Sequence, residues 1–335
     1  MSPATRTLTL SAATDLILRA LTANGVPARA AASVARALVA AEAEGQQGHG
    51  FSRLADYVAQ VRSGKVVADA EPRLIQSVGT ALMVDAGHGF AYPALDLAID
   101  ALCEAAHRMG TASAGVTRSH HCGALSVQVE RIARQGLIAI MVANAPAAIA
   151  PWGGNRPLYG TNPIAFAAPR AGKSPLVIDL SLSVAARGRV MNARKTGQPI
   201  PAGWAFDADG APTTDAKAAL DGTMAPIGGA KGTALALMVE ILSASLTGAT
   251  ASRDATSFFT ADGDPPGTGQ FLMALRPGAG FADRLEPLLT AIAETEGARL
   301  PGARRAQAIA AAATDGIAVP EFYLRQAQDM AGDHG

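Results

Sequence analysis

Apolar residues in the first hundred positions recur at the spacing of helices. Three runs place their apolar residues on one helical face, and each ends at a glycine, namely Gly25, Gly45 and Gly64. Ser11 stands where it can cap the first run. A short strand is predicted at 81–85 and a long amphipathic helix at 92–109. We therefore expect this part of the chain to be helical around one strand.

From residue 112 the pattern changes to short apolar runs separated by glycine and proline, which is typical of strands and turns. The predicted strands are 112–117, 137–143, 163–168, 176–180 and 270–275. Further helices are predicted at 123–135, 232–246, 281–294 and 303–313. This order predicts an α/β fold in two domains. A mixed-sheet domain would span 116–275, and a mainly helical domain would combine 1–115 with 276–335.

Composition narrows the class of protein. The 335 residues carry 28 acidic and 28 basic side chains, a balance that does not indicate a nucleic acid or a membrane as partner. No apolar run approaches the ~18 residues of a membrane span, and the first residues lack the apolar core of a signal peptide. Two cysteines make no disulfide framework, and no His/Cys/Asp cluster has metal-ligand spacing. We expect a soluble cytoplasmic protein without a metal ion.

The segment from Thr117 to Gly123 carries two of the six histidines at a predicted strand–helix junction. Histidine exchanges a proton near neutral pH, although a lone histidine at such a junction is more often structural. Adjacent residues of an extended chain point to opposite faces, so His120 and His121 cannot easily share one role. The helix predicted after Gly123 offers free N–H groups to an anion.

Two further candidates lie outside this junction. His49 and Arg53 are four residues apart, which brings their side chains close together if a helix begins near Gly50, and a guanidinium binds a carboxylate with two hydrogen bonds. A capping histidine and a solvated arginine explain the same pattern. Lys231 follows two glycines at the start of an apolar helix, which suits a phosphate or a plain glycine turn about equally. Its order of residues does not match the Walker pattern.

Other enzyme signatures are missing from the sequence. No G-x-G-x-x-G follows a predicted strand, so motifs alone do not support a Rossmann fold. No G-x-S-x-G nucleophile elbow is present, which argues against a serine hydrolase.

Several long motifs together resemble one family. They are Gly-His-Gly-Phe-Ser-Arg-Leu at 48–54, Ser-His-His-Cys-Gly at 119–123, Ala-Pro-Trp-Gly-Gly at 150–154, Gly-Thr-Asn-Pro-Ile-Ala at 160–165, the segments 200–207 and 212–215, and Gly-Gly-Ala-Lys-Gly at 228–232. The chain resembles the type II malate/L-lactate dehydrogenases, which include ureidoglycolate and sulfolactate dehydrogenases, diketogulonate reductase and Δ1-piperideine-2-carboxylate/Δ1-pyrroline-2-carboxylate reductases. The resemblance implies an NAD(P)-dependent oxidoreductase with a non-Rossmann, mixed-sheet NAD(P)-binding domain. It also implies a homodimer with the active site near the subunit interface.

The resemblance also assigns residues by their place in the motifs. His121 matches the catalytic acid/base, and His49 and Arg53 match groups on the substrate side, with Thr161 lining the same cleft. The cofactor-binding positions implied are Asn144, Ala145, Asn162, Asp179, Ser181, Lys231, Gly302 and Arg304. The chain has Gln47-Gly48 where the family commonly has Asp-Ser, so a hydroxyl near the substrate is absent.

The resemblance leaves the chemistry open between two substrate classes. Hydride transfer to C2 of a small 2-oxo acid would let His121 donate a proton to the alkoxide, with Arg53 clamping the carboxylate and Asp207 as a candidate to orient the imidazole. Reduction of a cyclic imino acid to L-proline or L-pipecolate would use the same residues. A non-catalytic nucleotide-binding protein is a third alternative, and the choice of NAD or NADP is not visible in the sequence.

Overall fold

The computed structural model describes residues 4–333. The strands are β1 (Thr5–Leu8), β2 (Arg73–Val78), β3 (Ala81–Asp85), β4 (Thr111–Ser119), β5 (Ile138–Ala143), β6 (Ile164–Arg170), β7 (Lys173–Leu180), β8 (Ala205–Phe206), β9 (Pro212–Thr213), β10 (Thr223–Met224), β11 (Thr268–Leu275) and β12 (Ile317–Pro320). The α-helices are α1 (Leu10–Ala23), α2 (Ala28–Ala43), α3 (Leu54–Arg62), α4 (Ala91–Met109), α5 (Leu125–Ala133), α6 (Arg187–Thr196), α7 (Ala216–Asp221), α8 (Ala230–Glu240), α9 (Phe281–Glu294), α10 (Ala303–Asp315) and α11 (Glu321–Ala331). Two 3₁₀ turns, η1 (Gln47–His49) and η2 (Phe51–Arg53), precede α3, and a π-helical segment, η3 (Ile241–Ser245), continues α8.

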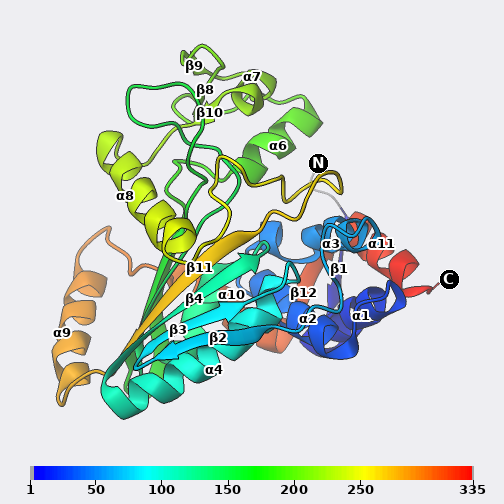
Figure 1. Ribbon diagram of the computed structural model, residues 1–335. Coiled ribbons are helices and arrows are strands. Elements are labelled where there is room, and N and C mark those ends of the chain that lie inside the picture. The colour runs from blue at the N-terminus through cyan, green and yellow to red at the C-terminus, as the bar shows by residue number, and fades with distance from the viewer. Residues whose placement is uncertain (1–3, 334–335) are drawn as a thin grey trace.

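A seven-stranded mixed sheet forms the centre of the molecule, which confirms the predicted fold class. Its order is β2-β3-β4-β11-β5-β6-β7, and only β3 and β4 run parallel. A parallel pair needs a long crossover, and α4 provides it. Figure 1 shows α4 lying along the sheet, where α4 and α5 share one apolar core with the strands.

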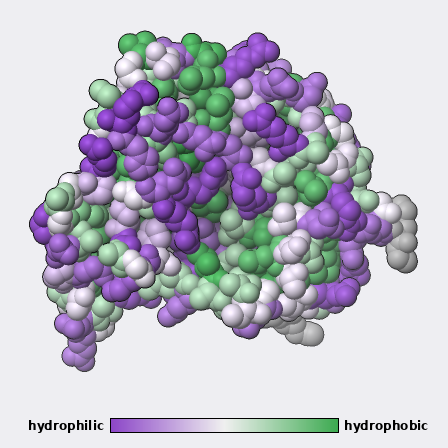
Figure 2. All heavy atoms as spheres, turned by 90° about the horizontal axis from the view of Figure 1, so that it is seen from below, coloured by the Kyte–Doolittle hydropathy of each residue, from purple (hydrophilic) through white to green (hydrophobic). Residues whose placement is uncertain are grey.

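Both ends of the chain meet in a helical layer beside the sheet (Figure 1). A second core joins side chains of α1, α2 and α3 to Leu324 of α11, and β1 pairs antiparallel with β12. A third, smaller core lies under α6, α7, α8 and the β8–β10 strands. The surface seen from below in Figure 2 mixes polar and apolar side chains.

The strands β2 and β3 belong to the sheet, and α4 packs on it, although all three fall within the segment 1–115 assigned to the helical domain. The sheet therefore starts about 40 residues earlier in the chain than the predicted boundary, and the division into two domains stays a prediction.

Two helix starts differ from the expected positions. Thr9, and not Ser11, caps α1, because its hydroxyl accepts the N–H of Ala12 while β1 pairing fixes the preceding residues. The helix expected from residue 123 begins at Leu125, because Gly123 takes a left-handed conformation with φ +70°.

Candidate active site

One edge of the seven-stranded sheet gathers most of the residues singled out by the sequence. The register that aligns this edge pairs Ser119 with Thr268, Gln270 with Ala143, Val142 with Ile164, and Ile164 with Leu180. The positions next to these strand ends are His121, Asn144, Thr161, Asn162 and Ser181. Residues spread over 60 positions of sequence therefore lie along one line, since β4, β5 and β7 end where β6 and β11 begin.

His120 and His121 have different hydrogen-bond partners, although both rings lie against Tyr57 and Phe258 and do not face opposite sides as expected for an extended chain. His120 is 1% exposed, and its Nε2 hydrogen bonds with Gln60 Oε1 at 2.6 Å. His121 Nδ1 hydrogen bonds instead with the hydroxyl of Tyr57 at 2.6 Å. Within residues 4–333 no hydrogen bond involves His121 Nε2, so this nitrogen is available to a ligand.

His49 and Arg53 come together with His121, although no α-helix begins between them. The turns η1 and η2 carry them instead, and the ring of His49 stacks on that of His121 with centroids 5.3 Å apart and planes at 14°. The carboxylate of Glu42 accepts the N–H of Phe51 at 2.9 Å and occupies the space where a side chain on Gly50 would sit. The bend between the two turns therefore depends on Gly50.

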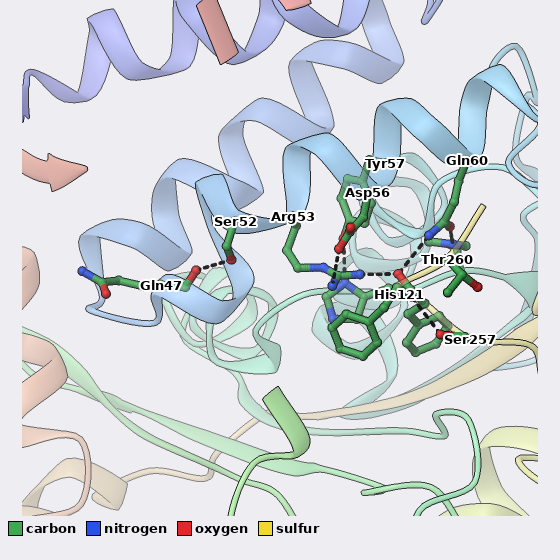
Figure 3. Close-up of polar contacts among 12 residues, drawn as sticks. Gln47, Ser52, Arg53, Asp56, Tyr57, Gln60, His121, Ser257 and Thr260 are labelled. Carbon is green, nitrogen blue, oxygen red and sulfur yellow. Dashed lines mark hydrogen bonds and ion pairs between the residues drawn. The ribbon is translucent and has the colours of Figure 1, made fainter. Parts of the chain in front are cut away.

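Arg53 is 3% exposed and sits among aromatic rings and a carbonyl. It forms an ion pair with Asp56 at 2.8 Å, donates to the carbonyl of Phe258 at 2.5 Å, and lies 4.4 Å from the ring centroid of Phe259. Figure 3 shows Arg53 and Gln60 reaching the same carbonyl oxygen. Arg53 Nε and His49 Nδ1 are buried without a partner in the described chain, and such groups are rare unless a ligand completes them.

The two stacked histidines are neutral at physiological pH. Burial, followed by the charge of Arg53, lowers the pKa of His49 to about 4 and holds the pKa of His121 well below its usual range. The guanidinium is then the one formal cation among these three side chains. A small anion that reaches Arg53 would find a donor at Nε and two uncharged imidazoles beside it.

The amide side chains at the sheet edge hold the edge together. Asn144 donates to the carbonyl of Thr250 at 2.9 Å and accepts the N–H of Gly269 at 2.8 Å. Asn162 donates to the carbonyl of Ala236 at 2.9 Å and to Glu240 at 3.0 Å. Asn144 therefore joins the end of β5 to the start of β11, and Asn162 joins the turn before β6 to α8.

The remaining positions at this edge are held by short contacts. A side chain on Gly160 would lie 2.3 Å from the carbonyl oxygen of Ala145, so the backbone at Gly160 packs closely against the backbone at Ala145. The carbonyl of Thr161 accepts the N–H of Leu182 at 2.9 Å, and Ser181 hydrogen bonds with Ser183 at 2.7 Å.

Asp179 occupies the anion position that the sequence indicated at the start of α5. Its carboxylate accepts the N–H of Ser126 at 2.8 Å, and burial raises its pKa. The free N–H group predicted there for a ligand is therefore satisfied by the chain itself.

Two helix N-termini are candidate binding positions for the phosphates of a nucleotide. Gly302 precedes α10 with φ +75°, and a side chain there would meet the carbonyl of Val177 at 2.5 Å. Gly229 precedes α8 with φ +62°, and the exposed Lys231 lies in the first turn. Arg304 is exposed in the first turn of α10, and residues 299–305 line a pocket of about 430 Å³. Basic side chains at glycine-initiated helices fit a phosphate-bearing cofactor such as NAD or NADP.

The suggested role of Asp207 was wrong. Its carboxylate accepts the N–H groups of Asp209 and Ala211 in the β8–β9 turn, at 3.0 and 2.9 Å. The orienting contact to His121 comes from Tyr57. The sequence pattern predicted only that Tyr57 lies on the apolar face of α3. A buried tyrosine hydroxyl needs a hydrogen-bond partner, and that requirement could have indicated a polar role for Tyr57.

The aromatic cover of the site was not foreseen. Phe258 packs on both His120 and His121, with ring centroids 5.4 and 5.2 Å away. It lies in a loop after α8 that no periodic pattern marks. Among residues 4–333, no group of three or more His, Cys, Asp or Glu could hold a metal ion, and no helix is long and apolar enough to cross a membrane.

Comparison with known proteins gives one consistent assignment. The family model for malate/L-lactate dehydrogenase matches residues 8–327. A (2R)-3-sulfolactate dehydrogenase (NADP(+)) of Chromohalobacter salexigens is 51% identical over 303 residues, which cover 90% of this chain and 91% of the relative. A Δ1-pyrroline-2-carboxylate/Δ1-piperideine-2-carboxylate reductase of Pseudomonas aeruginosa is 40% identical over 326 residues, covering 95% and 97%.

Solved structures agree with the sequence relatives. The Δ1-piperideine-2-carboxylate reductase of Pseudomonas syringae superposes with a TM-score of 0.92 at 37% identity, covering 97% of this chain and 99% of that one. The sulfolactate dehydrogenase of Methanocaldococcus jannaschii gives 0.89 at 26% identity, covering 98% and 97%. The chain therefore belongs to the malate/L-lactate dehydrogenase family and is an NAD(P)-dependent oxidoreductase.

Proposed function

We propose that the enzyme transfers a hydride between nicotinamide and C2 of a small 2-hydroxy/2-oxo acid, with NADP as the preferred cofactor. A three-carbon acid with a second anionic group, of the sulfolactate type, is the favoured substrate because the 51% identical relative bears that name. The observation that carries the proposal is the cluster of two stacked neutral imidazoles beside a buried arginine whose Nε lacks a partner.

In this mechanism each side chain has one task. Arg53 binds the substrate carboxylate, because a guanidinium pairs with a carboxylate through two parallel N–H groups. His121 donates the proton on Nε2 to the oxygen that develops negative charge, and accepts it in the reverse reaction. His49 stacks on His121 and offers a hydrogen bond near the same oxygen. A bound nicotinamide supplies the hydride, and Lys231, Gly302 and Arg304 would hold its phosphates.

The positions Asn144, Ala145, Thr161, Asn162, Asp179 and Ser181 complete the proposed cleft. Because several of their side chains are committed to internal hydrogen bonds, we propose that they shape the cofactor and substrate surfaces chiefly through the backbone of the sheet edge.

Reduction of a cyclic imino acid is the second candidate. The 40% identical relative and the structural neighbour with a TM-score of 0.92 carry such names. The same cluster fits this reaction, since the substrate is again a carboxylate and the proton would go to nitrogen.

A substrate panel separates these alternatives. Purified enzyme is assayed with NADPH and NADH against 3-sulfopyruvate, oxaloacetate, pyruvate, Δ1-pyrroline-2-carboxylate and Δ1-piperideine-2-carboxylate. The first proposal requires the highest kcat/KM with 3-sulfopyruvate and NADPH. Highest activity with either imine would support the second candidate, and cofactor binding without any oxidation would refute both.

The residue roles are tested by paired variants. His121→Gln should lower kcat about 10²–10⁴-fold, the range of positioned acid–base groups, while NADPH binding is kept. The exposed His107 provides the control, and His107→Gln should behave as wild type. Arg53→Lys should raise KM by about tenfold or more, because a lysine cannot make the two-pronged contact. Wild-type turnover in His121→Gln would remove the acid–base assignment.

We also propose a homodimer with α8 in the interface. The helix is apolar on nearly all sides, a pattern of buried helices, yet its side chains Leu235, Leu237 and Met238 are 40–43% exposed in one protomer. Ile241 and Leu246, in and just after η3, are 50% and 55% exposed. Asn162 at the sheet edge contacts α8, so an interface there would lie near the active site. Light scattering should give twice the monomer mass, and Leu237→Glu should reduce it.

We propose the cytoplasm as the working compartment. Both cysteines are buried free thiols, which is usual in a reducing compartment.

A further inference from the structure

A buried chain of hydroxyl groups leads away from His121. The Tyr57 hydroxyl lies 2.6 Å from His121 Nδ1 and 2.9 Å from the Tyr92 hydroxyl. Tyr57 is 0% and Tyr92 2% exposed, and the two tyrosines come from different helices, α3 and α4. The contact therefore spans the boundary between the helical layer and the helix that packs on the sheet.

The chain has a definite direction. A tyrosine hydroxyl holds one hydrogen, and a neutral imidazole holds one hydrogen on two nitrogens. If Tyr92 donates to Tyr57, and Tyr57 donates to Nδ1, every hydrogen in the chain has an acceptor. In the opposite direction the Tyr92 hydrogen would have no acceptor among residues 4–333 and would depend on a water molecule. The satisfied arrangement places the proton of His121 on Nε2, which is the form needed to donate to substrate.

The far residue of the chain, Tyr92, is 2% exposed and borders a pocket that is lined by none of the active-site histidines named above. Tyr92 lines a pocket of about 290 Å³ together with Ser33 and Asp96, and the rim includes Arg36 and Arg134, whose side chains are 53% and 58% exposed. The relay proposed below would take its proton from water in this pocket. The close fit of Tyr92 also explains Gly123, because a side chain there would lie 2.6 Å from the Tyr92 hydroxyl.

We propose that Tyr57 and Tyr92 are positioning residues that form a proton relay from the α4 pocket to His121 Nδ1. The proposal rests on the acid–base role proposed for His121. When the Nε2–H bond breaks and the substrate O–H bond forms, Tyr57 passes its proton to Nδ1, Tyr92 passes its proton to Tyr57, and water replaces the proton of Tyr92. After the product leaves, a solvent proton binds Nε2 and the Nδ1 proton returns along the chain, so one solvent proton is used for each carbonyl reduced.

The surroundings disfavour charge on every member of the relay. Burial holds the pKa of His121 well below its usual range, raises the pKa of Tyr57 to about 12, and raises the pKa of Tyr92 well above its usual range. A histidine that loses its Nε2 proton with no replacement on Nδ1 would become an imidazolate, and the relay avoids that charged form. The guanidinium of Arg53 lies 5.5 Å from the centroid of the Tyr57 ring.

The test uses the isosteric variants Tyr57→Phe and Tyr92→Phe, the double variant, and Tyr323→Phe on α11 as control. The relay requires that Tyr57→Phe and Tyr92→Phe each lower kcat by roughly 10–100-fold with little change in KM. It also requires that the double variant be no slower than Tyr57→Phe, because both changes cut one path. Tyr323→Phe should match wild type.

A proton inventory distinguishes a relay from a structural contact. The rate in H₂O/D₂O mixtures should follow a curve in the wild type, where several protons move, and a line in Tyr57→Phe. A wild-type kcat in Tyr92→Phe, or a curved inventory in Tyr57→Phe, would overturn the relay. His121→Gln is run in parallel: if it retains full activity, the proposed function fails, whereas its inactivity beside an active Tyr92→Phe removes only the relay.

Discussion

Lys65 holds in place the loop that carries Phe258, the aromatic residue packed on the active-site histidines. Replacing Lys65 should make this loop less ordered. The side chain is 1% exposed, and its ammonium donates to the carbonyls of Ser257, Thr260 and Asp262 at 2.8, 3.1 and 2.7 Å. The same loop presents Phe258 to His121. Lys65→Met keeps most of the apolar stem and removes the three donors.

The magnitude follows from those three bonds. A hydrogen bond to a charged group contributes about 1.5–3 kcal/mol, so three would sum to at least about 4.5 kcal/mol if all carbonyls stayed buried. Thr260 and Asp262 are exposed residues, and their carbonyls can bind water once the loop moves. We therefore expect a loss of about 3–5 kcal/mol in the free energy of unfolding.

Urea unfolding and steady-state kinetics measure the two consequences. Lys65→Met should unfold at lower urea and show a kcat/KM reduced by about tenfold, since Phe258 supports both His121 and Arg53. Lys173→Met is the control, because Lys173 is 57% exposed and its ion pair with Glu286 is at the surface, where such pairs contribute little to stability. An unchanged urea midpoint in Lys65→Met would refute the fastening role.

Three further substitutions test other parts of the site. Gly302→Ala should raise the Kd for NADPH at least about tenfold, because its side chain would meet the Val177 carbonyl at 2.5 Å; Gly297→Ala has nearly the same φ, +73°, with nothing within 4 Å, and should leave the Kd unchanged. Burial raises the pKa of Glu42 from 4.5 to about 7, so its contribution to stability is full below pH 4.5 and declines as pH rises to 7. Between pH 5 and 8 the free energy of unfolding, measured in urea, should therefore fall by about 2–3 kcal/mol less in Glu42→Gln than in wild type, and an equal fall in both proteins would contradict this. Gly48→Ser restores a hydroxyl where nothing lies within 4 Å, so it should leave the thermal midpoint nearly unchanged and shift the ratio of kcat/KM between 3-sulfopyruvate and oxaloacetate by roughly tenfold; an unchanged ratio would show that position 48 does not select the substrate.

The parts of the fold that were predictable carry strong local patterns. The strand at 81–85 and the helix at 281–294 are observed with the predicted bounds, because alternation and amphipathic spacing there match their burial. The strand β2 was missed because its six residues are all exposed, so no alternation marks it. The helix α6 was missed because it buries only Val190 and its remaining residues are mostly polar.

The candidate site also has a part that the sequence predicted and a part that it could not predict. His49 and Arg53 were paired correctly from their spacing, although 3₁₀ turns rather than an α-helix bring them together. The stacking of His49 on His121 joins residues 72 positions apart, and no local pattern encodes such a contact. The family resemblance supplied that pairing, and the sequence supplied only the residue types.

Motif matching also cannot separate a residue that touches the cofactor from one that builds the surface beneath it. Asn162 is fully buried, has φ +38°, and donates to Ala236 and Glu240. An asparagine tolerates this left-handed backbone better than most residues, so its place in the motif follows from the turn before β6 as readily as from ligand contact. Lys231 has no such internal task, since it is exposed and makes no ion pair within residues 4–333. The exposed basic residues at the helix N-termini are therefore the stronger candidates for direct cofactor contact, and the buried amides are the support that keeps the strand ends in line.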